Sequence, residues 1–163
     1  KEQVVPKLYT LFESKKWKVR WVAASLVLKT MKTKDLPEFM HHLPATAATK
    51  IGLSEPTTYG ALIGKMEGDP KPQDAIRPYL SSKELGPRLT ALGFYYEGKK
   101  ADVPVVQSHE DDKAPLPKCD KDDECGWTCV VPKAPGSQET EQKTITTVGE
   151  FAKYCVVPSM TNK

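Results

Sequence analysis

The chain lacks the features that mark several common protein classes. Its longest uncharged, largely apolar run covers residues 21–28, which is far too short to span a bilayer. It has only three histidines and contains no G-x-S-x-G, H-E-x-x-H or glycine-rich phosphate-binding motif. No charged n-region, apolar h-region and small-residue cleavage site opens the chain, so we expect no signal peptide in the given sequence. The chain starts at Lys1 rather than Met, and we expect a processed or trimmed N-terminus. We expect no transmembrane segment, no catalytic residue and no cofactor.

Charge is nearly balanced overall but uneven along the chain. The 163 residues include 24 Lys and Arg against 21 Asp and Glu, for a net charge of +3. This excess is well below that of a dedicated nucleic-acid-binding domain, so nucleic acid is not the favoured partner. Residues 1–34 hold nine Lys and Arg and two Asp and Glu, whereas 110–124 hold seven Asp and Glu and three Lys. The sequence therefore predicts a basic N-terminal surface.

All four cysteines lie late in the chain, at Cys119, Cys125, Cys129 and Cys155. Their C-x5-C-x3-C-x25-C spacing lacks the paired C-x2-C knuckles of common structural zinc sites, and the acidic residues nearby disfavour a zinc ion held by four thiolates. A small polar segment with few apolar residues needs cross-links to be stable. Two disulfides are therefore favoured over a zinc site, and they indicate an extracytoplasmic location, in the periplasm, at the outer envelope or in a secreted protein.

The pairing of these cysteines is open among three arrangements. We prefer Cys119–Cys125 with Cys129–Cys155, in which the first bond closes a small acidic loop and the second ties a predicted strand to a predicted helix. The alternative is Cys119–Cys129 with Cys125–Cys155. Trp127 is expected to cover the disulfides, because one large ring supplies much of the core of a small unit.

Helical periodicity dominates the first two thirds of the chain. Several predicted helices have a proline in the first turn, where its missing N–H is harmless, and Asp35 is a candidate N-cap. The helix over 17–31 is apolar around much of its circumference and is expected to be buried on more than one side. Gly60 and Gly64 are expected to weaken the helix that contains them. The predicted helices cover 4–14, 17–31, 35–43, 54–66, 73–80, 83–98 and 102–107.

The helical region repeats at an offset of 68 residues. In both copies a short helix, a tight turn and a longer buried helix precede a loop and a new helix with proline in its first turn. This offset is about twice the roughly 34-residue length of a helical-pair repeat, a period typical of stacked helical hairpins. The equivalent pairs are Ser14 and Ser82, Lys15 and Lys83, Arg20 and Arg88, Ala23 and Ala91 and, after one deletion, Asp35 and Asp102, and Pro37 and Pro104.

These residues resemble a known family. The V-R-x-x-A stretch that contains Arg20, the P-R-L-T-A stretch that contains Arg88 and the prolines early in the first helices are similar to HEAT-like (armadillo-type) repeats of the short bacterial type. The resemblance covers roughly residues 3–107. It implies a mainly α fold, a short α-solenoid of about three helical hairpins over 1–107, in which both arginines are structural because they cap or bridge neighbouring turns.

The rest of the chain lies outside this resemblance. Residues 108–124 are rich in proline, acidic residues and lysine, have almost nothing to bury and are predicted to be a linker. Residues 125–163 are predicted to form a small disulfide-stapled α+β appendage. A solenoid exposes an apolar face at its end, and we expect this appendage to cap it.

Within the appendage a hairpin and a helix are predicted. Alternation and β-branched residues indicate strands over 127–133 and 143–147. Thr147 with Glu150 three residues later matches a capping box at the start of a helix over 148–154. The last residues of the chain are expected to be frayed.

Two clusters of potential metal ligands give only weak signals. His41 shares a helical face with Glu38, but the adjacent His42 points about 100° away and no third ligand is evident. The acidic run 120–124 resembles a calcium loop, but its glycine comes one position late and position 131 holds valine rather than the glutamate of an EF-hand. We expect a solvated loop and no metal site.

The sequence points to a binding surface rather than a catalytic centre. Lys15, Lys16, Trp17 and Lys18 combine a basic patch with an exposed aromatic residue, which is typical of surfaces that bind proteins or polyanions. We expect a non-enzymatic protein-interaction or scaffold module of the cell envelope or exterior, compatible with a larger assembly or an oligomer. The alternative is a module that binds a polyanion (glycan, lipid head group or nucleic acid) through the basic N-terminal repeat, and a third reading is a metal-dependent enzyme.

Overall fold

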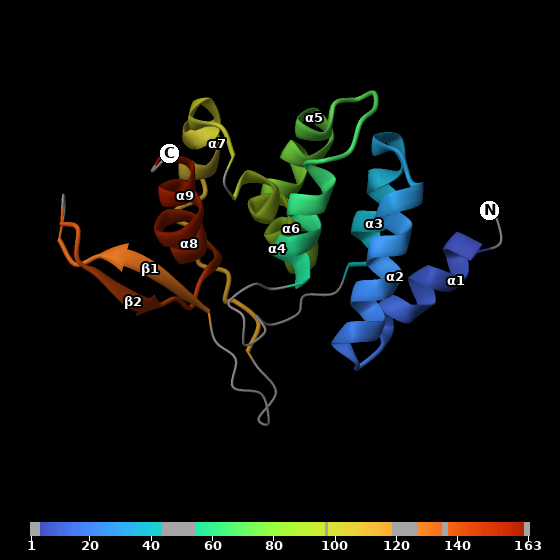
Figure 1. The fold of residues 1–163 in the computed structure, drawn as a ribbon, viewed down its shortest axis with the longest axis horizontal. Coiled ribbons are helices and arrows are strands. Elements are labelled where there is room, and N and C mark those ends of the chain that lie inside the picture. The colour runs from blue at the N-terminus through green and yellow to red at the C-terminus, as the bar shows by residue number, and fades with distance from the viewer. Residues whose placement is uncertain (1–3, 44–54, 97, 119–126, 135–136, 162–163) are drawn as a thin grey trace. The chain divides into compact units, whose positions relative to one another are not determined.

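The computed structural model describes residues 4–43, 55–96, 98–118, 127–134 and 137–161 (Figure 1). These residues are mainly helical and include one two-stranded antiparallel sheet, which confirms the mainly α fold class with a small α+β part. They divide into two compact units, the first formed by 4–43 and 55–94 and the second by 95–161. In this described part of the chain, no helix is long and apolar enough to cross a membrane.

The first unit is built from short helices joined by 3-10 turns. The helix α2 contacts both α1 and α4, which confirms that it is buried on more than one side. The elements are α1 (Val4–Thr10), α2 (Trp17–Thr30), α3 (Leu36–His41), α4 (Glu55–Ile63), α5 (Pro72–Ile76) and α6 (Leu85–Tyr95), whose last residue belongs to the second unit.

The turns before α2 and α6 share the same hydrogen bonds. The Arg20 guanidinium donates to the Ser14 carbonyl, and Arg88 donates from Nε and Nη2 to the Ser82 carbonyl at 2.8 and 2.6 Å. Each serine Oγ also accepts from the backbone N–H two residues later, at 3.2 Å in both turns. The residues involved are 68 positions apart, so the same local structure recurs at the offset that was found in the sequence.

Removing either arginine is expected to destabilise the protein. Arg88→Ala leaves the Ser82 carbonyl without its charged donor, and we expect the free energy of unfolding to fall by about 1.5 kcal/mol, with a similar loss for Arg20→Ala. Urea unfolding followed by circular dichroism measures the change. Arg77→Ala, at an exposed arginine on the preceding 3-10 turn, is the control, and losses no larger than its own would contradict a structural role for Arg20 and Arg88.

A 3-10 turn followed by a short helix with an early proline also occurs twice. The turn Thr33–Asp35 leads into α3, and the turn Lys100–Asp102 leads into α7 (Val103–Gln107). Pro37 and Pro104 lie in the first turns of these helices, where proline removes no helical hydrogen bond.

The Asp35 side chain does not cap α3. It makes no cap hydrogen bond to that helix, and its Oδ2 accepts instead from the backbone N–H of Lys32 at 2.9 Å. Asp35 therefore occupies the predicted N-cap position of α3, but its carboxylate closes the 3-10 turn that precedes the helix instead of capping the helix.

Helices α4 and α6 approach each other through glycines. A Cβ added at Gly60 would lie well inside 3.0 Å of the Thr90 carbonyl oxygen, and one added at Gly93 would lie equally close to the Thr57 carbonyl oxygen. Only glycine fits at such distances. From the sequence, Gly60 was expected to weaken its helix. In the structure, the missing side chain of Gly60 allows α4 to pack closely against α6.

The second unit combines α7 with a hairpin and a C-terminal helical segment. The strands β1 (Thr128–Pro132) and β2 (Thr140–Thr144) pair antiparallel, with Thr128 opposite Thr144 and Pro132 opposite Thr140. Beyond the hairpin, α8 (Val148–Phe151), a π-helical turn (Ala152–Val156) and α9 (Val157–Thr161) follow without a break. The helix thus extends past its predicted end, and Met160 is buried near the terminus, where fraying was expected.

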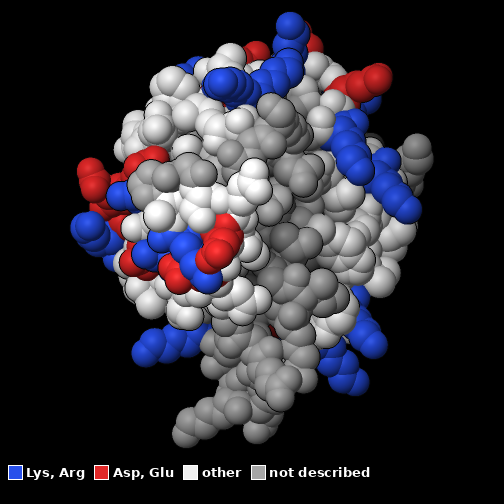
Figure 2. All heavy atoms as spheres, turned by 60° about the vertical axis from the view of Figure 1, so that its left-hand side comes forward, with Lys and Arg blue, Asp and Glu red and all other residues white. Residues whose placement is uncertain are grey.

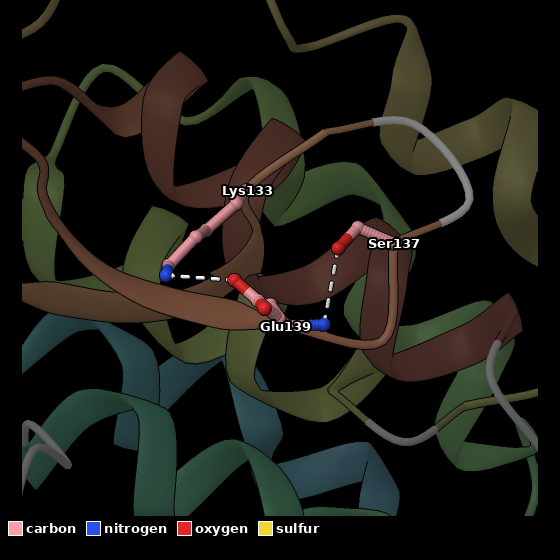
Figure 3. Close-up of polar contacts among 3 residues, drawn as sticks. All are labelled: Lys133, Ser137 and Glu139. Carbon is pink, nitrogen blue, oxygen red and sulfur yellow. Dashed lines mark hydrogen bonds and ion pairs between the residues drawn. The ribbon is translucent and has the colours of Figure 1, made fainter.

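The second strand begins earlier than predicted. Its pairing with β1 extends to Thr140, and beyond Pro132 the Lys133 Nζ lies 2.9 Å from the Glu139 Oε2 (Figure 3). Glu139 also donates its backbone N–H to the Ser137 Oγ at 3.0 Å. After β2 the Ile145 backbone N–H donates to the Trp127 carbonyl at 2.9 Å, and the Ile145 side chain is buried. Register and core packing, rather than β-branching alone, therefore determine where the strand lies.

The segment that was expected to be a linker packs in the second unit. Leu116 is buried, and the Trp127 Nε1–H donates to the Pro117 carbonyl at 3.1 Å. Gly149 allows close approach, because a Cβ there would meet the backbone of 110–112. Residues 108–118, the described part of the predicted linker, thus belong to the same compact unit as α7, so no unit boundary falls at the predicted position 107. Backbone hydrogen bonds join Leu116 to Thr146, Ala114 to Val148 and Asp112 to Gly149.

A disulfide joins Cys129 on β1 to Cys155 in the π-helical turn. This confirms one bond of the preferred pairing, and it ties the strand to the helix as predicted. Trp127, two residues before Cys129, is buried. Its ring packs edge-on against the Phe151 ring, with the ring centroids 5.3 Å apart. The other predicted bond and the candidate calcium loop, Cys119, Cys125 and 120–124, lie outside the described residues.

The capping box at the start of α8 is confirmed. Thr147 Oγ1 accepts from the Glu150 backbone N–H at 3.2 Å, and Glu150 Oε2 accepts from the N–H groups of Thr146 and Thr147 at 2.7 and 3.2 Å. The backbone and side-chain hydrogen bonds from Thr146 lower the pKa of Glu150 from its usual 4.5. Ionised Glu150 is therefore preferred in the folded state.

This lowered pKa predicts an acid-sensitive contribution to stability. The contribution is present above the unfolded-state pKa, near 4.5, and is lost as the pH falls through the lower folded-state pKa. Glu150→Gln is expected to weaken the dependence of unfolding free energy on pH below this value, as measured by urea unfolding across the acid range. Glu141→Gln, at an exposed position on β2, is the control, and an equal effect of both changes would contradict the assignment.

Candidate interaction surface

Exposed side chains of two kinds share one face of α2. Lys18, Val22, Leu26 and Lys29 are all exposed and recur at intervals of 4, 4 and 3 residues, which places them on the same side of the helix. Val22 and Leu26 are 56% and 45% exposed, unusually high for large apolar residues in the middle of a helix. We call these four residues the outer face of α2.

An apolar groove adjoins the outer face of α2. Its volume is about 770 Å³, and Leu26 belongs to both the groove and the outer face, so the two are continuous. Lys34, Asp35 and Glu38 give the groove a rim of mixed charge. Its apolar lining residues include Val4, Val5 and Leu8 from α1, together with Leu26, Met31 and Pro37.

The equivalent face of α6 is covered by another helix. At the 68-residue offset, Val22 corresponds to Thr90 and Leu26 corresponds to Phe94. Thr90 is fully buried and Phe94 is half-buried, and Gly60 of α4 lies against the backbone of both. The outer face of α2 is thus equivalent to the face of α6 that α4 covers.

The basic residues singled out in the sequence lie at the start of α2. Lys15, Lys16, Trp17 and Lys18 are all exposed, and Trp17 is 44% exposed. The Lys18 Nζ lies 5.8 Å from the centre of the Trp17 ring, within range of a cation–π interaction. Because Lys18 also belongs to the outer face of α2, the basic turn continues into that face.

A polar cluster lies beside α1. The Tyr9 ring stacks on His42 at 4.2 Å, and the His42 Nε2 lies 3.2 Å from the Glu38 Oε1. Burial, followed by the negative charges of Glu38 and Asp35, raises the pKa of Tyr9 to about 12, so the phenol stays neutral. Glu38 pairs with His42 rather than with His41, which the predicted helical faces had favoured. No three His, Cys, Asp or Glu residues gather as a metal site within the described part of the chain.

Sequence reasoning missed Val22 and Leu26 as surface residues. Their helix is apolar enough to look buried, and it is buried toward α1 and α4. The sequence offered no local signal for this exposure, because Val22 and Leu26 are as apolar as the buried residues of the same helix.

Comparisons with known proteins give no relative from which to transfer a function. No protein-family model, curated protein or solved structure matches the chain. Figure 2 brings forward the side on which β1 and β2 lie in Figure 1, and acidic and basic side chains lie close together there.

Proposed function

We propose that this protein is a non-enzymatic protein-interaction or scaffold module that binds its partner through the outer face of α2 and the adjoining groove. The observation that supports this most is the exposure of Val22 and Leu26 beside an apolar groove. Exposed apolar patches with polar rims mark protein-interaction sites. Because α4 covers the equivalent face of α6, a surface of this kind is suited to a helix.

A HEAT-like solenoid of about three hairpins is the architecture that we propose for the helical part. The matching bonds of Arg20 to Ser14 and of Arg88 to Ser82 support it. In such arrays each unit buries a face of its neighbour. In this proposal the outer face of α2 is a stacking face of that kind, with Val22 and Leu26 exposed on it.

An extracytoplasmic location forms part of the proposal, with the protein in the periplasm, at the outer envelope or secreted. The disulfide between Cys129 and Cys155 supports it, because such bonds persist in oxidising compartments. Thiol labelling of the protein isolated from its own cells tests this directly. No cysteine should be labelled before reduction, and free thiols at that stage would contradict the location.

Capture of the partner by wild-type and variant protein tests the proposed function. Val22→Asp with Leu26→Asp places charges at exposed positions, so the variant should keep its circular dichroism spectrum and recover at least tenfold less partner. Val130→Asp is the matched control, because Val130 is 64% exposed but lies on β1. Undiminished recovery by the α2 variant would contradict binding at this surface.

A second candidate partner is a polyanion held by the basic turn. The adjacent exposed residues Lys15, Lys16 and Lys18 beside Trp17 favour it. Binding driven by counterion release falls steeply with salt, whereas binding in an apolar groove does not. Titration with heparin at low and moderate salt, using Lys15→Glu with Lys16→Glu as the variant, distinguishes the two candidates.

A further inference from the structure

We propose that the segment bound at the outer face of α2 is an amphipathic helix of another protein with acidic residues beside its apolar stripe. This inference rests on the proposed function and names the class of partner. Two independent observations support it: the helix that covers the equivalent face of α6, and the charge of the outer face itself.

The packing of α4 on α6 shows how a helix fits this face. In α6 the face consists of Thr90, Gly93 and Phe94, and Gly93 allows backbone contact with α4. The equivalent of Gly93 in α2 is Ser25, and the outer face presents the larger Val22 in place of Thr90. A helix docked on α2 is therefore held at the usual interaxial distance of about 8–10 Å and contacts it through apolar side chains.

The lysines specify the charge of the partner. Lys18 and Lys29 stand at the two ends of the outer face, 11 residues apart, which corresponds to about 16 Å along the helix axis. The four residues of the outer face include no acidic side chain, and the acidic residues Asp35 and Glu38 lie on the rim of the adjoining groove, beside Lys34. A partner helix with carboxylates about three turns apart meets both lysines while its apolar stripe covers Val22 and Leu26.

The same lysines disfavour another molecule of this chain as the occupant. In a symmetric contact between two outer faces, Lys18 and Lys29 of one molecule would meet the lysines of the other in either helix direction. Like charges brought together across an interface are destabilising. The face is therefore suited to a helix of opposite charge, bound in the helix-in-groove mode.

Binding of two synthetic peptides to the full chain tests this inference. The peptides are four-turn helices with the same leucine stripe, flanked by glutamates in one and by lysines in the other, and fluorescence anisotropy measures their affinity. We expect the glutamate peptide to bind at least tenfold more tightly. Lys18→Glu with Lys29→Glu should reverse the preference. Lys83→Glu with Lys100→Glu, at two exposed lysines elsewhere, makes the same change in net charge and should leave it intact.

The outcomes separate this inference from the proposed function. Three results would overturn the inference that the partner is an acidic helix: equal affinity for the two peptides, no binding of either, or no reversal in the Lys18 and Lys29 variant. None of these results contradicts the proposed function, which the partner-capture experiment tests separately. Sedimentation of the wild-type chain as a dimer that Val22→Asp with Leu26→Asp dissociates would also overturn it, because another molecule of the chain would then be the occupant.

Discussion

Replacing Gly60 by alanine is expected to lower the free energy of unfolding by about 3 kcal/mol. The added methyl group would overlap the Thr90 carbonyl oxygen and the Phe94 backbone, and neither backbone atom can move without shifting the whole of α6 against α4. This loss far exceeds the gain of about 1 kcal/mol that alanine brings over glycine inside a helix. Urea unfolding monitored by circular dichroism measures the net effect.

Gly64 provides the matched control for this change. A Cβ added there would lie 3.5 Å from the Ala61 carbonyl oxygen and 3.6 Å from the Phe94 ring, which are ordinary contact distances. We expect Gly64→Ala to change the unfolding free energy by no more than about 0.5 kcal/mol. If both variants are equally stable, the close packing of α4 on α6 is wrong.

Removing the disulfide between Cys129 and Cys155 should have a similarly large effect. The bond links residues 26 positions apart, and the loss of this constraint on the unfolded chain corresponds to about 3.5 kcal/mol. Replacing both cysteines by alanine is expected to shift the urea midpoint of the second unit accordingly. The same replacement at Cys119 and Cys125 opens a shorter predicted loop and should cost less. If the variant without Cys129 and Cys155 is as stable as the wild type, this disulfide does not stabilise the second unit.

The features that could be predicted from the sequence are those with local causes. The capping box needs only Thr147 and Glu150, and the turns before α2 and α6 need only a serine carbonyl and an arginine six residues later. The bond between Cys129 and Cys155 followed from placing a strand and a helix around the two cysteines. In each case, short-range chemistry determines the structure almost independently of the rest of the chain.

The features that could not be predicted depend on contacts between distant residues. Nothing near Gly60 in the sequence shows that the carbonyl of Thr90 approaches it. The backbone of Leu116 is held by a hydrogen bond to the carbonyl of Thr146, which lies 30 residues later. The composition of the segment around Leu116 is typical of a linker, because most of its residues are polar or proline. Leu116 is the residue of this segment that is buried among 108–118.

The candidate surface was predicted only in part, for the same reason. The basic turn around Trp17 is a local pattern and was identified from the sequence. The exposure of Val22 and Leu26 depends on which neighbours surround α2, and the amino-acid composition of a helix does not report which of its faces is open. The comparison with α6 supplied that information, because it shows the same face with its neighbour in place.

Photo-cross-linking from the outer face of α2 tests the central claim most directly. A benzophenone amino acid would be placed separately at Val22, at Leu26 and, as a control, at the more exposed Val130, and each protein would be irradiated in its native compartment. The account predicts that positions 22 and 26 cross-link to the same protein, within an acidic amphipathic helix, and that position 130 does not. Cross-links of equal yield from all three positions, or none from positions 22 and 26, would contradict it.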